Sequence, residues 1–179
     1  MAGGRAFRQE QRGVAAGMAA ALATTVIVLG ATALAWPGEA LPFPDRLQLT
    51  LRADLIVIVW LAAAIGNVAR LRFFSEQDIG GSSAEDASAK IRVAGAILQN
   101  TFEQAVLAIV THLIVAATFA RAGTAIIMLA CLFAAGRLLF WIGYRKGARA
   151  RAFGFALTFY PSVLALLAAA VAMVLGVAT

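Results

Sequence analysis

Polar and ionisable side chains stand inside two long apolar segments of this sequence, where a bilayer would make them costly. Arg137 follows an uncharged apolar run and precedes Tyr144 by seven residues, which is about two helical turns. Asn100 and Glu103 are three residues apart in another apolar segment, so they lie on one helix face. An arginine at the bilayer centre costs about 2.5–3.5 kcal/mol on insertion scales. Because ionisable residues within a membrane are functional candidates by default, these residues point to a polar site inside the membrane.

The composition is that of an integral membrane protein. Of the 179 residues, 62% are hydrophobic and 13% are charged, whereas soluble domains average about 45–50% and about 25%. The net charge of +6 comes from cations beside apolar segments. Because no nucleic-acid recognition motif accompanies these cations, we expect no nucleic-acid partner. Cys131 is the only cysteine and His112 the only histidine, so neither an internal disulfide nor a histidine cluster for a metal is expected.

Five segments are long and apolar enough to span about 30 Å of hydrocarbon, and we expect them to be helices. They are Val14–Ala35, Ala53–Phe73, Val93–Ala120, Ala122–Tyr144 and Ala152–Val177. The first has no convincing signal-peptide cleavage site before Trp36, so it is expected to remain in the protein. The connections predict a proline-rich irregular loop after the first span, a mobile polar loop over Ser75–Ala89 and a tight turn at Arg121–Gly123.

The distribution of lysine and arginine predicts the orientation in the membrane. With the N-terminus in the cytoplasm, the flanks on the outer side carry only Arg46, Arg52 and Arg121. All other cations except Arg137 then fall on the inner side, as the positive-inside rule requires. We therefore predict a cytoplasmic N-terminus and an outer C-terminus. The alanine- and arginine-rich composition points to a bacterial source and hence to the inner membrane.

Distances along the chain bring several of the polar residues to one depth. Measured from the tight turn near Ala122, the positions of Glu103 and Arg137 differ by about one helical turn. Two interpretations of this pair are open: a buried ion pair that only holds two helices together, or part of a polar site near the inner leaflet. Seven residues gather there and are the candidates for such a site: Arg70, Asn100, Glu103, Arg137, Tyr144, Arg149 and Arg151.

Two further polar residues have structural interpretations. His112 lies mid-membrane, where we expect a hydrogen bond to a neighbouring helix, through Thr111 or Thr118. Asp54 lies near the outer surface and is expected to pair with Arg52.

Three blocks of the sequence resemble the MAPEG family, the membrane-associated proteins in eicosanoid and glutathione metabolism. The blocks are GNVARLRF (residues 66–73), QNTFEQ (residues 99–104) and GRLLFWIGYRKGARAR (residues 136–151). Their order and spacing match the family from Ala53 to the C-terminus. The resemblance implies an all-α membrane domain, a four-helix bundle over residues 49–179, that forms a homotrimer. Residues 1–48 would add one transmembrane helix and the proline-rich loop.

The resemblance also implies a ligand and the roles of the candidate residues. Glutathione would bind between adjacent subunits near the cytoplasmic leaflet, at a site lined by Arg70, Asn100, Glu103, Arg137 and Tyr144. The two carboxylates of glutathione suit arginines, and its amine suits a glutamate. Arg151, with Arg149 as a substitute, would stabilise the thiolate, since a nearby cation lowers the pKa of a thiol.

Two positions depart from the pattern of the family. Ala96 stands where an arginine is usual, and Arg92, one turn earlier, could compensate only by reaching. Phe140 replaces a common histidine or tyrosine.

Two functions therefore remain open. One is glutathione-dependent transferase or peroxidase chemistry on a lipophilic electrophile. The other is a non-catalytic membrane scaffold or accessory subunit, in which Val14–Ala35 covers a lipid-facing surface or docks a membrane-protein partner. A transporter is a weaker third alternative, because no pair of broken helices is visible.

Overall fold

All five predicted spans are helices in the computed structural model, which describes residues 2–81 and 86–177. They are α1 (Ala2–Ala35), α2 (Phe43–Phe73), α3 (Ala89–Thr118), α4 (Gly123–Tyr144) and α5 (Ala148–Val174). Each is long and apolar enough to cross a membrane. Within the described ranges there is no strand. The predicted all-α membrane fold with five spans is confirmed.

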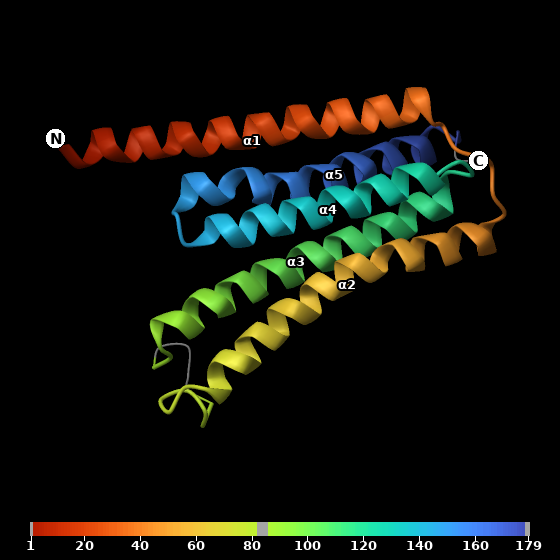
Figure 1. Cartoon of the computed structure of the whole chain (residues 1–179). Helices are drawn as coiled ribbons and strands as arrows, with labels where there is room; N and C mark the ends of the chain where they lie inside the picture. Colours follow the sequence, from red (N-terminus) through yellow and green to blue (C-terminus); the bar gives the residue numbers. More distant parts are fainter. Residues whose placement is uncertain (1, 82–85, 178–179) are drawn as a thin grey trace.

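Consecutive helices run in opposite directions (Figure 1). The N-terminus, the α2–α3 connection and the α4–α5 turn lie together at what we name the loop end of the bundle. The C-terminus, the α1–α2 connection and the α3–α4 turn lie at the opposite end, which we name the hairpin end. This alternation is the arrangement that the positive-inside analysis predicts, with the loop end toward the cytoplasm.

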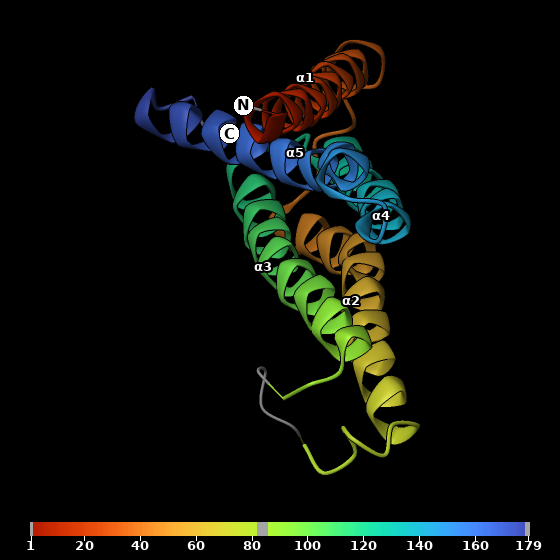
Figure 2. The ribbon, with the colours of Figure 1, turned by 90° about the vertical axis from the view of Figure 1, so that its left-hand side faces the viewer.

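The helices form two groups that separate toward the loop end. Helices α4 and α5 pack along each other, α1 lies along α5, and α2 pairs with α3. Two perpendicular views (Figures 1 and 2) show the α2–α3 pair diverging from the other three helices as it approaches the loop end.

Four helices begin earlier than their apolar segments predict, and the difference is largest for α1 and α2. Helix α1 starts at Ala2 and α2 at Phe43, so each carries a charged first part that precedes the hydrophobic stretch. Pro44 stands in the first turn of α2, where a missing backbone N–H costs nothing. Asp45 in the same turn complements the positive end of the helix dipole. Hydropathy marks the hydrocarbon-spanning part of a helix, which explains why the predicted starts were late.

Glycines allow α4 and α5 to approach closely. A Cβ atom added to Gly136 on α4 would lie 2.6 Å from Cγ2 of Thr158 on α5. A Cβ atom on Gly154 of α5 would meet the backbone nitrogen of Phe140. Small residues at helix contacts are the usual way in which membrane helices bring their backbones together. The close approach places Arg137, next to Gly136, beside Thr158.

The described part of the loop between α2 and α3 is folded around Asp78. This side chain is fully buried, and its carboxylate accepts hydrogen bonds from Oγ of Ser75 at 2.5 Å and from the backbone N–H of Ser88 at 3.0 Å. Ser88 is also the N-cap of α3 and accepts from the N–H of Ile91. The predicted mobile loop is therefore held by local contacts at both ends, and residues 82–85 lie outside the described ranges.

Candidate functional site

Arg137 is the largest fully buried side chain of the described protein, with 1% of its surface exposed. Its Nη1 donates a hydrogen bond to Oδ1 of Asn100 on α3 at 2.8 Å, and its Nη2 donates to Oγ1 of Thr158 on α5 at 2.5 Å. The guanidinium carbon lies 4.5 Å from the ring centroid of Phe140, a cation–π distance. Arg137 therefore connects three helices at one depth in the bundle.

The predicted ion pair between Glu103 and Arg137 does not form within the described chain. Glu103 is exposed, and its Oε1 accepts a hydrogen bond from Nε2 of Gln99 at 2.9 Å. Asn100 faces α4, while Glu103, about 60° away around the helix, faces outward. The depth argument was right about the level of α3 and α4 but wrong about which side chain meets Arg137.

Thr158 is a site residue that the sequence analysis missed. It is 1% exposed, and its hydroxyl also donates to the backbone oxygen of Phe155 at 2.7 Å. Thr158 follows Arg151 by seven residues, so the two lie on one face of α5 about two turns apart. That spacing was the available signal. A lone threonine in an apolar helix usually bonds its own backbone, which is why it drew no attention.

A cavity of about 400 Å³ lies beside these contacts toward the loop end, and we name it the Arg151 cavity. Its lining comes from four helices: Val14, Met18, Ala96, Asn100, Phe140, Tyr144, Ala148, Arg151, Ala152 and Phe155. Three predicted site residues, Asn100, Tyr144 and Arg151, share this cavity. Arg137 lies against two of its walls, since it bonds Asn100 and stacks on Phe140.

Arg151 and Tyr144 contact each other across the α4–α5 turn. The guanidinium carbon of Arg151 lies 4.5 Å from the ring centroid of Tyr144, which in turn packs edge-on against Phe140 at 5.3 Å. Gly147 makes the turn possible, because its φ of 100° is a conformation that other residues rarely adopt. The turn sets Arg151 in the first part of α5, half-buried and held over an aromatic ring.

Arg149 does not reach the Arg151 cavity. It is two residues before Arg151, so it projects from nearly the opposite face of α5. Its side chain lies across Gly13 of α1, where an added Cβ would come within 2.5 Å of Cδ of Arg149. The role of Arg149 as a substitute for Arg151 stays a prediction, and in this structure the stem of Arg149 packs on α1.

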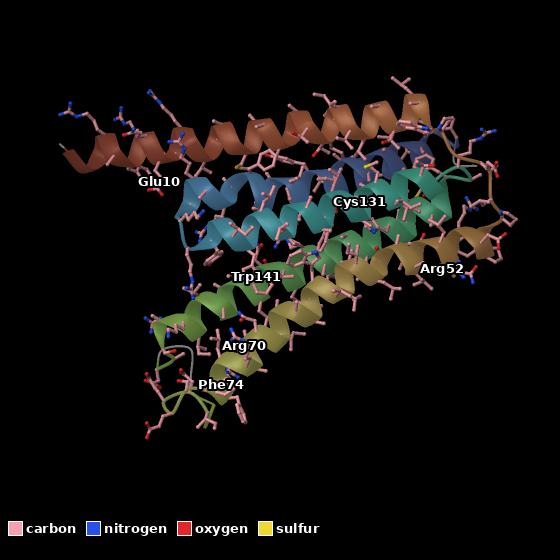
Figure 3. All side chains as sticks on the ribbon, viewed as in Figure 1. Glu10, Arg52, Arg70, Phe74, Cys131 and Trp141 are labelled. Carbon is pink, nitrogen blue, oxygen red and sulfur yellow. The ribbon has the colours of Figure 1, made fainter. Side chains whose placement is uncertain are left out.

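Arg70 is also away from the cavity. It lies on the diverging part of α2 near the loop end (Figure 3), it is exposed, and its Nη2 donates to Oδ1 of Asn67 at 3.2 Å. Within one chain the structure therefore brings together four of the seven predicted site residues. It leaves Arg70, Glu103 and Arg149 outside.

A second cavity adjoins the site on the other side of Ala96. It measures about 440 Å³, and its lining includes Arg72, Arg92 and Gln99 together with Ala96. We name it the Arg92 cavity. In this structure Arg92 does not take the place of the absent arginine, because its Nη1 donates to the backbone oxygen of Ala87 at 2.6 Å. Ala96 is thus an exposed small residue that lines both cavities.

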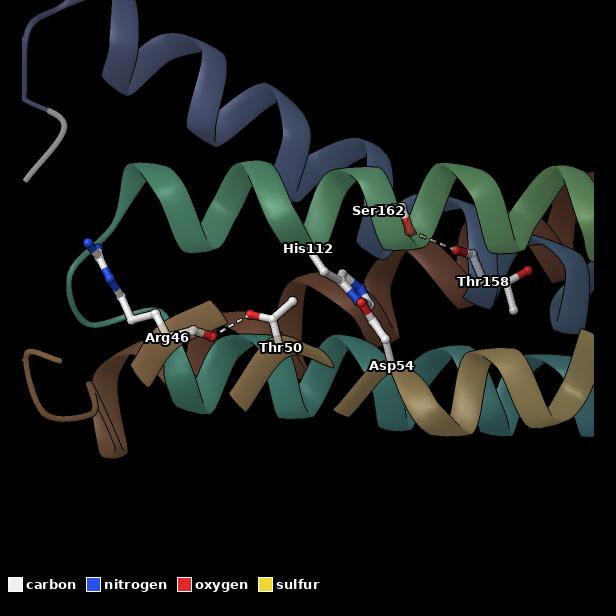
Figure 4. A network of polar contacts seen from close by, with 6 residues as sticks. All are labelled: Arg46, Thr50, Asp54, His112, Thr158 and Ser162. Carbon is white, nitrogen blue, oxygen red and sulfur yellow. Dashed lines mark hydrogen bonds and ion pairs between the residues drawn. The ribbon is translucent and has the colours of Figure 1, made fainter. Parts of the chain in front are cut away.

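A further buried polar contact joins α2 and α3 nearer the hairpin end. Nδ1 of His112 lies 2.5 Å from Oδ1 of Asp54, and their side chains are 1% and 6% exposed (Figure 4). The predicted pairing of Asp54 with Arg52 and the predicted threonine partners of His112 are both wrong. The hydroxyl of Thr118 donates to the backbone oxygen of Ile114. Residues 58 positions apart cannot be matched from sequence without the rotation of each helix.

Comparison with known proteins places these observations in one family. The family model of the MAPEG family matches residues 50–172, more than half of the chain. No match was found among curated proteins or among solved structures. The matched range begins in the second turn of α2 and ends in the last turn of α5, so it holds every residue of the polar contacts described above, while α1 precedes it. The chain is an integral membrane protein that belongs to the MAPEG family.

Proposed function

We propose that this protein binds glutathione at the Arg151 cavity in the inner membrane of a bacterium. There it either joins glutathione through its sulfur to a lipophilic electrophile or uses the thiol of glutathione to reduce that electrophile. The observation that supports this most is the arrangement of Arg151, Tyr144 and Asn100 around one cavity within the membrane. A cation, a phenol and an amide are the groups that a thiolate and a carboxylate need as partners. Family membership supports the same ligand.

The residues of the cavity have distinct tasks in this proposal. Glutathione supplies a thiol, whose thiolate form is the nucleophile. The positive charge of Arg151 favours the thiolate of glutathione over the thiol. The proton that the thiol loses passes to water at the loop end. The ring of Tyr144 holds the guanidinium in position through the 4.5 Å cation–π contact. Asn100, fixed by Arg137, presents its amide to the ligand.

The walls of the cavity fit the second reactant. Val14, Met18 and Phe155 make the membrane-facing side apolar, and a volume of about 400 Å³ lies in the usual range for a ligand site of about 300–1,000 Å³. Two of these residues, Val14 and Met18, come from α1. Because α1 packs on α5 at this level, an electrophile dissolved in the bilayer would approach the sulfur between α1 and α3.

The outward-facing candidates support a site that is completed by another copy of the chain. Glutathione has two carboxylates and an amine, but the Arg151 cavity offers one arginine. Arg70 and Glu103 are exposed on the α2–α3 pair, where a neighbouring subunit of a trimer would face them. A trimer with intersubunit sites gives both residues a task that they lack within a single chain.

One observation favours the competing function, a membrane scaffold that keeps the fold without the chemistry. Two nitrogens of the Arg137 guanidinium are already bonded by Asn100 and Thr158, and its face is covered by Phe140. An arginine used in this way holds helices together and needs no ligand. Ala96 at the position of a usual ligand arginine points the same way.

Two measurements separate these functions. The purified full-length protein in detergent is heated with and without millimolar glutathione, and conjugation to a generic electrophile is then followed. Ligand at 100 times its dissociation constant raises the free energy of unfolding by about 2.7 kcal/mol. The proposal requires such stabilisation in the wild type, its loss in Arg151→Ala and its retention in the surface control Arg145→Ala. No stabilisation of the wild type at millimolar glutathione would support the scaffold.

A further inference from the structure

The hairpin end holds a larger cavity that the proposed site does not use. It measures about 540 Å³ and lies between α1 and the three helices α3, α4 and α5. Its lining is apolar, with Val26 and Leu29 from α1 and Phe119 from the end of α3 among the larger members. Arg121 is the one charged residue in the lining. We name it the Arg121 cavity.

Helix α1 turns an open groove into this cavity. Near the loop end α1 packs directly on α5, where a Cβ on Gly17 would touch Cβ of Ala152 at 3.4 Å. Toward the hairpin end the facing residues are small, among them Ala33 on α1 and Ala165 and Ala168 on α5, and they leave the space open. Because α1 precedes the range that matches the family, the cavity depends on a helix outside that range.

A cavity with such a lining is most stable when hydrocarbon occupies it. A cavity with an apolar lining does not hold ordered water, which needs polar partners. An empty cavity would forfeit the dispersion contacts of its walls. The surrounding medium of a membrane protein consists of acyl chains, so an acyl chain can enter between α1 and the bundle without leaving an apolar environment.

Arg121 supplies the other half of a lipid site. It lies exposed in the α3–α4 turn, and its Nη1 is 3.5 Å from the backbone oxygen of Gly38, a long and weak contact. The first turn of α4 begins immediately after it, and the N-cap residue Ala122 offers no side-chain acceptor. A guanidinium beside the positive end of a helix dipole favours an anionic group.

We propose that the Arg121 cavity binds one acyl chain of an anionic phospholipid, with the phosphate of that lipid on Arg121. The lipid fills the space between α1 and the bundle at the hairpin end and so attaches the outer half of α1. The headgroup lies in the leaflet opposite the Arg151 cavity. This site needs no glutathione, so the lipid proposal can be correct or wrong independently of the proposed function.

Lipid retention on the purified full-length protein tests the proposal. The protein is delipidated in mild detergent, incubated with phosphatidylglycerol or phosphatidylcholine, and the retained lipid per chain is counted by native mass spectrometry. We expect about one phosphatidylglycerol per chain and clearly less phosphatidylcholine. Arg121→Gln should lower phosphatidylglycerol retention about fivefold, the effect of one interfacial cation, and leave phosphatidylcholine unchanged. Arg52→Gln, a cation outside this cavity on α2 near the hairpin end (Figure 3), should change neither.

A second measurement does not require altered protein. Phosphatidylglycerol with a photoreactive acyl chain should label residues 26–33 of α1 and residues 119–129, and excess phosphatidylglycerol should compete for this labelling. Equal retention of the two lipids by the wild type, or labelling spread evenly along the outer faces of the helices, would overturn the proposal. If the intact oligomer retained no lipid, side chains of another copy of the chain would have to fill the cavity. That result would overturn the proposal as well.

Discussion

Nδ1 of His112 lies 2.5 Å from Oδ1 of Asp54, within the apolar interface between α2 and α3. Both side chains are almost completely buried, and Nε2 of the histidine and Oδ2 of the aspartate have no protein partner among the described residues. Each group therefore depends on the other for its burial. The pair binds the two helices of the diverging group to one another.

Removing one member of this pair should destabilise the protein strongly. His112→Ala leaves the carboxylate of Asp54 buried without a partner, and breaking a buried pair in this way typically costs about 3–5 kcal/mol. We expect a clearly lower unfolding temperature in detergent for this variant. The double variant Asp54→Ala and His112→Ala should be more stable than His112→Ala alone, because no unpaired charge remains.

Thr111 provides the matched control for this experiment. Its buried hydroxyl has no hydrogen-bond partner in the described structure, so Thr111→Val removes a polar group of similar size without breaking a contact. Its unfolding temperature should equal or exceed that of the wild type. If Thr111→Val destabilised as much as His112→Ala, the effect would belong to α3 in general and not to the pair.

Gly154 should tolerate no side chain. An added Cβ would collide with the backbone nitrogen of Phe140 on α4, and backbone atoms cannot move aside without separating the helices. Gly154→Ala should therefore lower stability by about 1–3 kcal/mol, the usual range for overpacking. Gly66→Ala on α2 is the control, since nothing lies within 4 Å of its added Cβ. That change should be neutral or stabilising by up to about 1 kcal/mol, and thermal unfolding of both variants checks the difference.

Much of this fold could be predicted from the sequence, because a bilayer allows only helices of a certain length and apolar character. The spans, the order of the turns and the similar depth of Glu103 and Arg137, to within about one turn, follow from length and spacing alone. The rotation of each helix about its axis does not. That rotation turns Glu103 outward and Asn100 inward, and it decides which of two nearby polar residues meets Arg137.

The site residues that sequence reasoning missed were missed for the same reason, because contacts between helices depend on how each helix is rotated and how closely it packs. Thr158 meets Arg137 only because glycines bring α4 and α5 close together, and Asp54 meets His112 only because two helices distant in sequence face each other. Arg149 was named as a substitute for Arg151 because the family resemblance implies an arginine near the start of the last helix, and a helix turns residues two apart to nearly opposite sides. Spacing along one helix was informative, whereas contacts between helices required the structure.

Thr158→Val tests whether Arg137 is held in place before any ligand binds. The substitution removes the acceptor of the 2.5 Å bond from Nη2 and leaves that donor buried, which typically costs about 1–3 kcal/mol. The unfolding temperature without glutathione should fall accordingly. An unchanged unfolding temperature would mean that the guanidinium finds another partner and that Thr158 is not part of the site. Ser162→Ala, one turn further along α5, is the control, since its hydroxyl makes only a long 3.4 Å bond to a backbone oxygen.

Arg151 should control the ionisation of bound glutathione. At neutral pH the wild-type protein is expected to show the ultraviolet absorbance of a thiolate when glutathione is added, and Arg151→Ala should lose it, because the cation that favours the charged form is gone. Arg149→Ala is the matched control, since its side chain packs on Gly13 of α1. Equal thiolate absorbance in Arg151→Ala and Arg149→Ala would mean that Arg151 does not stabilise the thiolate. Arg151→Lys should retain part of the signal, because it keeps the charge but not the planar group that stacks on Tyr144.

Ala96→Arg should strengthen glutathione binding by restoring a cation where the family usually has one. Ala96 is exposed to the Arg151 cavity on one side and to the Arg92 cavity on the other, so an arginine there can extend into open space without displacing packed atoms. One additional hydrogen bond to a charged group is worth about 1.5–3 kcal/mol, which corresponds to an affinity at least about tenfold higher. Binding measured by thermal stabilisation across a glutathione series checks this, with Ala96→Gln as the uncharged control of similar length. If Ala96→Arg bound glutathione no better than Ala96→Gln, the carboxylates of the ligand would have to lie elsewhere, which would contradict the binding of glutathione beside Ala96.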